Sequence, residues 1–159
     1  CETCKSYCVS KPGWFKPGEA ERAAKLLGIS MERFFKKYLA VDYYAATPAN
    51  GLRHDLFVLA PATRTIKPGR EYPFDPLGEC VFYKDGVCQI HEAKPFECKE
   101  AWHGDGADRE IHKRVAESWE PRGADIAQLL GREPELPEVN LKDALDLMLK
   151  SIGPRGWPS

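Results

Sequence analysis

The sequence predicts a small single domain of the α+β class, mostly helical, with a short cysteine-bearing β-hairpin and irregular loops. Three observations predict this class: apolar residues recur at helical spacing in several segments, one short apolar run has strand character, and a turn dipeptide separates two β-prone runs. With 159 residues, of which 43% are hydrophobic and 30% charged, the chain is long enough to bury a sizeable core. We expect one domain over residues 1–159, comprising a cysteine-rich region (1–104), a helical extension (105–153) and a tail (154–159).

Two helices are predicted near the N-terminus. The first begins after Pro17, which suits a first helical turn, and ends at Gly28. The second is capped by Ser30 and runs into the segment SMERFFKKYLAVDYY (30–44), whose apolar residues recur at helical spacing and form one buried stripe. The members of this stripe are Met31, Phe34, Phe35, Tyr38 and Leu39. An aromatic stripe of this kind is more typical of a core than of a cofactor site.

The middle of the chain has strand and turn signals. DLFVLA (55–60) predicts a short buried strand that ends at Pro61, and the segment 61–78, rich in Pro and Gly, predicts an irregular loop. CVFYKDGVCQI (80–90) predicts a β-hairpin, because Asp85-Gly86 suits a two-residue type I′ turn. The strands of this hairpin are expected to carry Cys80 and Cys88 and to bring them together.

Three helices are predicted in the C-terminal third. DREIHKRVAESWE (108–120) has one apolar face and stops at Pro121. A short helix over 124–130 is ended by Gly131, and another is predicted over 141–152.

Composition argues against two classes of partner. The 23 basic and 24 acidic residues are scattered and give a net charge of −1, so the chain lacks the basic patch typical of nucleic-acid binding. No apolar run approaches the roughly 20 residues of a membrane span. We therefore expect a soluble, cytoplasmic protein with neither a nucleic-acid nor a membrane partner.

The sequence begins at Cys1 rather than at methionine, so we expect a processed or trimmed chain. A lipidated N-terminal cysteine is a less favoured interpretation.

The six cysteines form two triplets, C-x2-C-x3-C and C-x7-C-x9-C, separated by a long thiol-free segment. Inert core thiols would be expected to scatter instead. Three disulfides are allowed by the even count, in 15 connectivities, but a domain of this size needs no such staples. The C-x2-C spacing is the knuckle by which thiolates bind a soft metal. The sequence therefore favours a metal site over disulfides, provided that the compartment is reducing.

Both triplets are expected to serve one site, because each triplet alone offers three thiols, whereas a closed zinc or [4Fe–4S] site needs four. Pro95 favours a turn that returns Cys98 to the hairpin, so the irregular loops would surround a metal site. The candidate ligands are Cys1, Cys4, Cys8, Cys80, Cys88 and Cys98. Two histidines near these cysteines, His91 and His103, are further candidates, although such histidines more often donate hydrogen bonds to sulfur than bind the metal. His54 and His112 lie far from any cysteine in sequence and are left out.

Three features carry a resemblance to a known family: the N-terminal triplet, the run F-x-P-G-E into LLGISMERFFKKYL, and the segment GECVFYKDGVCQIHEAKPFEC. They resemble the YkgJ-type cysteine-cluster family, described as zinc- or iron-chelating domains with an N-terminal CxxCxxCC cluster. The resemblance covers roughly the first hundred residues and implies a zinc- or iron-binding domain. The chain departs from the family pattern at Tyr7-Cys8, where the family has adjacent cysteines, and at His91, where many members have tyrosine.

The number of cysteines bears on the kind of metal. One structural zinc takes four ligands, so six thiolates overfill a single site, whereas a [4Fe–4S] cluster takes four thiolates or three with an open iron. Thiolate-rich ligand sets suit both. We favour an iron–sulfur cluster, or iron, over zinc because of the surplus cysteines and the apolar residues near them that would exclude water. These residues are Trp14, Phe15, Val81, Phe82, Phe96 and Trp102.

Two classes of function follow. The first is a binding module whose cluster or metal serves electron transfer, sensing, metal handling or structure. The second is an enzyme, because flagellin lysine N-methylases resemble the same family in their cysteine cluster, which implies methyl transfer. The sequence HGDG (103–106) lacks the G-x-G-x-x-G spacing of a nucleotide loop, and no Ser/His/Asp signature stands out. We therefore favour the binding module, with a structural zinc-binding interaction module as the alternative.

Overall fold

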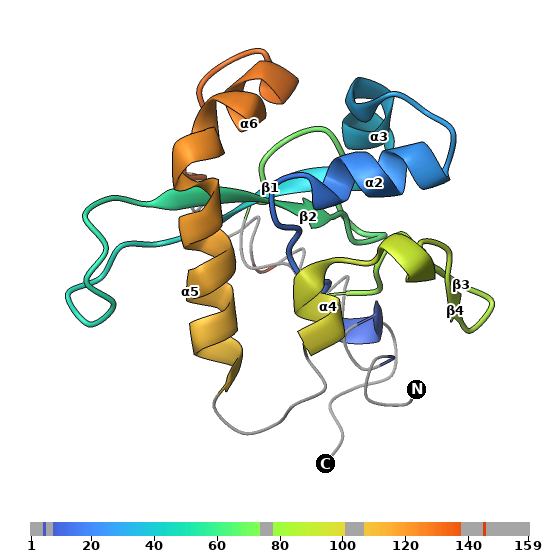
Figure 1. Cartoon of the computed structure of the whole chain (residues 1–159), viewed down its shortest axis with the longest axis horizontal. Coiled ribbons are helices and arrows are strands. Elements are labelled where there is room, and N and C mark those ends of the chain that lie inside the picture. The colour runs from blue at the N-terminus through green and yellow to red at the C-terminus, as the bar shows by residue number, and fades with distance from the viewer. Residues whose placement is uncertain (1–4, 6–7, 74–77, 101–106, 138–144, 146–159) are drawn as a thin grey trace.

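The computed structural model describes residues 5, 8–73, 78–100, 107–137 and 145. Within these ranges the chain has five α-helices and two small antiparallel sheets, which confirms the predicted α+β class (Figure 1). In chain order the elements are α2 (Glu19–Leu26), α3 (Met31–Tyr38), β1 (Leu39–Tyr44), β2 (Leu56–Pro61), β3 (Tyr83–Lys84), β4 (Val87–Cys88), α4 (Phe96–Glu100), α5 (Ala107–Trp119) and α6 (Gly123–Leu130). None of the described helices is long and apolar enough to cross a membrane.

The pair β1 and β2 forms the centre of the fold. The two strands are antiparallel, with Leu39 opposite Pro61 and Tyr44 opposite Leu56. Helices α5 and α6 pack on β2, while α3 leads directly into β1 and packs on α2 (Figure 1). Because most residues of both strands are buried, this small sheet behaves as the inner layer of the core.

Strand β2 confirms the predicted strand over 55–60, but the helix predicted through the segment 30–44 is wrong beyond Tyr38. Residues Leu39–Tyr44 are strand β1. The helical periodicity belongs to α3 alone, in which Phe34 and Phe35 are buried. The next residues, LAVDYY, are extended because β2 lies alongside and supplies their backbone partners, and β2 lies beyond the connection 45–55, outside the segment that shows the helical pattern.

The predicted helix ends are largely confirmed. Ser30 caps α3, where its hydroxyl accepts a hydrogen bond from the Arg33 N–H at 3.2 Å. Gly131 has φ of +76° directly after α6, a left-handed conformation that glycine adopts without strain. Helix α5 ends at Trp119, before Pro121. Apart from Leu145, which is helical, the helix predicted over 141–152 lies outside the described residues, as does the tail 154–159.

The predicted β-hairpin is present but shorter than expected. Strands β3 and β4 pair around Asp85 and Gly86, whose φ values of +52° and +79° are those of a type I′ turn. Cys88 lies on β4 opposite Tyr83. The prediction that a hairpin strand carries Cys80 is wrong, because Cys80 pairs instead with Thr63 in the preceding loop.

Tyr72 is the largest fully buried side chain, and its hydroxyl donates to the Pro61 carbonyl. Burial raises the pKa of Tyr72 well above its ordinary value, and the nearby Asp42 and Cys80 raise it further. Tyr72 therefore stays neutral in the folded protein at pH values where the unfolded chain ionises.

Stability is accordingly expected to fall as the pH rises past about 10, where an unfolded tyrosine loses its proton. The variant Tyr72→Phe should lose about 1 kcal/mol at neutral pH, since one hydrogen bond is gone, but should decline less at alkaline pH. Urea unfolding at about pH 7 and about pH 10.5 measures both effects. An equal alkaline decline in the two proteins would contradict the prediction.

Candidate metal centre

Four cysteines from both triplets line one small cavity. Its volume is about 20 Å³, and its lining contains Cys8 together with Cys80, Cys88 and Cys98. The other lining residues, nearly all apolar, are Pro12, Pro61, Phe82, Ile90, Lys94 and Pro95. The structure thus brings together every described cysteine of the two triplets, which are far apart in sequence. None of these four cysteines is in a disulfide bond.

Backbone pairing brings Cys8 to Cys80. The Cys80 N–H donates to the Cys8 carbonyl at 2.7 Å, and the Gly78 N–H donates to the Ser10 carbonyl at 2.8 Å. On its other side the same segment bonds to the loop after β2, through the Val81 N–H and the Ala62 carbonyl at 2.9 Å. The segment that carries Cys80 is therefore held between two other stretches of chain.

The N-terminal segment continues from Cys8 through the core. The Phe15 N–H donates to the Leu59 carbonyl of β2 at 2.9 Å, and the Trp119 Nε1–H of α5 donates to the Phe15 carbonyl at 2.7 Å. Phe15 itself is fully buried. These bonds anchor the segment 8–15 to β2 and α5, and so set the position of Cys8.

Cys98 lies in α4 and is held close to Gly13. A Cβ atom added at Gly13 would lie 2.8 Å from Cys98 Sγ and 2.9 Å from Cys98 N, distances that real Cβ atoms essentially never show. The Gly13 backbone also hydrogen-bonds to the Cys98 sulfur. Glycine is therefore required at position 13 for the N-terminal segment to approach α4 this closely.

Burial dominates the electrostatics of two of the thiols. It raises the pKa of Cys98 well above the ordinary value and that of Cys80 to about 12. Backbone hydrogen bonds from Phe82 and Tyr83 act in the opposite direction and lower the pKa of Cys80. One from Gly13 likewise lowers the pKa of Cys98. A metal binds the thiolate rather than the thiol. Cys80 and Cys98 would therefore lose their protons only if the positive charge of the metal compensated the negative charge of the thiolates.

Two buried glutamates hold α4, and sequence reasoning missed them as parts of the site. Glu19 Oε2 accepts from the Phe96 N–H at 3.0 Å, which ties the start of α2 to the start of α4. Glu97 accepts from the Trp14 N–H, and its other oxygen contacts His112 Nδ1 in an ion-pair arrangement. Nothing in the local pattern signals these roles, because the partners are 15 or more residues away in sequence.

Of the two candidate histidine ligands, the structure describes only His91, which does not line the cavity. His91 is exposed and lines a neighbouring hollow of about 360 Å³, which shares Cys8 and Cys88 with the cavity. His103 lies outside the described residues, as do Cys1 and Cys4. By contrast, His112 contacts Glu97, the residue before Cys98. His112 is not among the ligands predicted from the sequence, because it lies far from any cysteine in sequence.

The described cysteines do not form a ready-made site for a single ion. Within the described part of the chain, no group of three or more His, Cys, Asp or Glu side chains is placed so that it could hold a metal ion. A tetrahedral zinc site keeps its sulfurs about 2.3 Å from the metal and hence about 3.8 Å from each other. The four thiols thus share a cavity without that compact arrangement.

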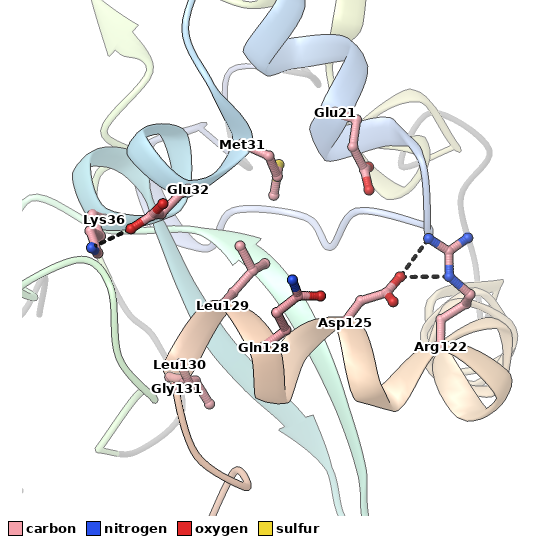
Figure 2. A pocket seen from close by; sticks show the side chains of 10 residues that line it. All are labelled: Glu21, Met31, Glu32, Lys36, Arg122, Asp125, Gln128, Leu129, Leu130 and Gly131. Carbon is pink, nitrogen blue, oxygen red and sulfur yellow. Dashed lines mark hydrogen bonds and ion pairs between the residues drawn. The ribbon is translucent and has the colours of Figure 1, made fainter.

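A second hollow, of about 580 Å³, lies between α2, α3 and α6 (Figure 2). Lys36 pairs with Glu32 at 2.7 Å, and Arg122 pairs with Asp125 at 2.5 Å. Met31 and Leu129 supply apolar surface between these pairs. None of the described cysteines or histidines lines this hollow, and its paired charges make it a weaker candidate than the cysteine cavity.

Comparison of the chain with protein-family models, curated proteins and solved structures gives no match. The resemblance to the YkgJ-type family therefore stays a prediction, and the cysteine cavity is the feature of the structure that bears on function.

Proposed function

We propose that the chain is a metal-binding cysteine-cluster protein that holds an iron–sulfur cluster. The observation that carries the proposal is that Cys8, Cys80, Cys88 and Cys98 line one cavity with largely apolar walls. Four thiolates are the usual ligand set of a [4Fe–4S] cluster. Cys1 and Cys4 are further candidate ligands. The proposed role is in redox chemistry, sensing or metal handling.

The surrounding residues fit a thiolate cluster. Pro12, Phe82 and Ile90 form walls that would exclude water. Backbone N–H groups bond to the sulfurs of Cys80 and Cys98, and hydrogen bonds of this kind stabilise the negative charge on cluster ligands and help to set the reduction potential.

Size decides which side of the cavity must open. A volume of about 20 Å³ has room for little more than one water molecule, and an iron–sulfur cluster is larger. Cys80 is buried, whereas Cys8 and Cys88 are half-buried and also line the hollow of about 360 Å³. Cluster binding therefore requires the cavity to widen toward the hollow, on the side of Cys8 and Cys88.

Structural zinc is the alternative, and the small volume favours it. One ion needs less room than a cluster, and four thiols are a complete zinc ligand set. In that case the chain would be a zinc-stabilised interaction module without redox chemistry.

Anaerobic purification separates the two proposals. We expect brown protein with about four iron and four sulfide per chain, which bleaches or gains an electron-spin signal with dithionite. Colourless protein with one zinc per chain, from cells grown with ample iron and unable to accept a reconstituted cluster, would leave the zinc module. Metal-free protein with disulfides, prepared under the same reducing conditions, would overturn both.

A further inference from the structure

Five basic side chains gather on the surface formed by α3 and the loop that follows β2. Arg33, Lys36 and Lys37 are exposed on α3, at the spacings of three and four residues that share one helix face. Lys67 and Arg70 are exposed in the loop. We call these five residues the basic patch. It is not visible as a cluster in the sequence, because its members come from two separate segments.

Backbone contacts hold these two segments together. The Gly69 N–H donates to the Leu39 carbonyl at 2.8 Å, and the Val41 N–H donates to the Arg70 carbonyl at 2.9 Å. A Cβ atom added at Gly69 would lie 3.2 Å from Lys36 Cα. The loop therefore runs against the end of α3 and the start of β1, and its two basic residues flank the point where it touches the helix.

Most of the positive charge of the basic patch is unpaired. Lys36 pairs with Glu32 at 2.7 Å. Within the described part of the chain, no acidic side chain pairs with Arg33, Lys67 or Arg70. Five positive charges and the negative charge of Glu32 leave a net charge of +4 on this surface, whereas the whole chain has a formal net charge of −1.

Two aromatic rings lie between the basic patch and the cysteine cavity. Phe82 is buried and lines the cavity. Its ring centroid lies 5.2 Å from that of Tyr38, which is half-buried at the end of α3. The Lys37 Nζ lies 5.2 Å from the centroid of the same Tyr38 ring. A partner seated on the patch would thus be separated from the cavity wall by the rings of Tyr38 and Phe82.

We propose that the basic patch docks an acidic electron-carrier protein, which exchanges one electron with the cysteine centre across Tyr38 and Phe82. An acidic surface complements the charge of the patch, and opposite charges steer two proteins together. In the exchange, one electron leaves the reduced carrier and the proposed cluster takes it up, while no bond forms or breaks. Electron-transfer complexes have small interfaces, so one helix face and one loop suffice. The electron step rests on the proposed cluster, whereas the docking does not.

Calorimetric titration of the full chain with three carriers tests the docking. A [2Fe–2S] ferredoxin and a flavodoxin are the acidic probes, and cytochrome c is the basic control. We expect at least one acidic carrier to bind saturably and cytochrome c not to bind. Raising the salt from about 20 mM to about 200 mM should weaken the binding at least tenfold, because salt screens exposed charges.

Charge reversals locate the docking surface. Arg70→Glu and Lys67→Glu should each weaken the affinity for the acidic carrier at least fivefold. Arg53→Glu is the matched control, because Arg53 is also exposed and pairs with no acidic side chain of the described residues. It belongs to the connection 45–55, at the opposite end of β1 and β2 from α3 (Figure 1). Its reversal should leave the affinity nearly unchanged.

Stopped-flow measurement of cluster reduction tests the electron step. At a saturating concentration of reduced carrier, Tyr38→Leu should slow the transfer at least threefold, because one of the two intervening rings is gone. Its affinity for the carrier should stay within twofold, since the five basic residues remain. An unchanged rate would exclude the route through Tyr38.

Three results would overturn the docking: no saturable binding of either acidic carrier, cytochrome c binding as tightly as the better acidic carrier, or equal effects of Arg70→Glu and Arg53→Glu. A DNA oligonucleotide that binds more tightly than both acidic carriers would instead mark the patch as a nucleic-acid surface. Docking is measured whatever metal the chain holds, so its failure is distinguishable from a missing cluster, which iron and sulfide analysis reveals. Docking without electron transfer to an iron-loaded chain would overturn the electron step alone.

Discussion

Replacing Cys98 with serine is expected to abolish stoichiometric metal binding and to lower the melting temperature of the metal-loaded protein by about 6–12 °C. Cys98 is half-buried and lines the cavity from α4, so no other described cysteine can take its place without moving α4. Metal binding at thiolates contributes directly to folding energy. A loss of about 3 kcal/mol corresponds to that temperature shift in a domain of this size.

Elemental analysis and calorimetry measure the two effects. Leu26→Ser is the matched control, because Leu26 is 45% exposed at the end of α2 and lines neither the four-cysteine cavity nor the hollow of about 360 Å³. It should keep full metal content. A chelator separates metal loss from packing loss: with metal removed, the gap in melting temperature between Cys98→Ser and the unchanged protein should shrink. A variant that kept its full metal content would exclude Cys98 from the ligand set.

Gly13→Ala is expected to destabilise the fold and to reduce metal content together. The new methyl would lie 2.8 Å from Cys98 Sγ, 2.9 Å from Cys98 N and 3.0 Å from Glu97 Cβ. Cys98 N belongs to the α4 backbone and Glu97 Cβ is bonded to it, so either α4 or the N-terminal segment must shift. Overpacking of this kind costs about 1–3 kcal/mol, and any shift of α4 displaces Cys98 from the cavity.

Gly123→Ala is the control for this change. Gly123 is the first residue of α6, its added methyl meets nothing within 4 Å, and alanine favours a helix by up to about 1 kcal/mol. Thermal unfolding should therefore show a lower melting temperature for Gly13→Ala and an equal or higher one for Gly123→Ala. Equal behaviour of the two variants would mean that the close approach of Gly13 to Cys98 does not exist in solution.

Local chemistry explains what the sequence predicts correctly. Ser30, Pro121 and Gly131 act within one helical turn, and Asp85-Gly86 acts within one hairpin, so their effects do not depend on the rest of the chain. The clustering of cysteines is also a local signal. It led to the interpretation that the two triplets share a site, and the structure places Cys8 beside the second triplet.

The incorrect or missing predictions all depend on distant partners. Strand β1 forms because β2 lies beside it, and Cys80 leaves the hairpin because its flanking residues Glu79 and Val81 hydrogen-bond to Arg64 and Ala62. The buried roles of Glu97 and His112 depend on α4 and α5 packing against Trp14. No pattern within a short window contains this information, since neither spacing nor propensity specifies which segments meet.

The threading of residues 8–15 through the core has a consequence for biosynthesis. This segment leaves the ribosome before the residues that it contacts, which are Leu59, Cys80, Cys98 and Trp119. Cys98 is made about 90 residues after Cys8, a delay of about 5–18 s at usual rates of translation. For most of that time the nascent chain displays Cys8 without Cys88 and Cys98, which line the same cavity in the folded protein. The proposed cofactor would therefore reach all four thiols only after both strands of the central sheet have emerged from the ribosome.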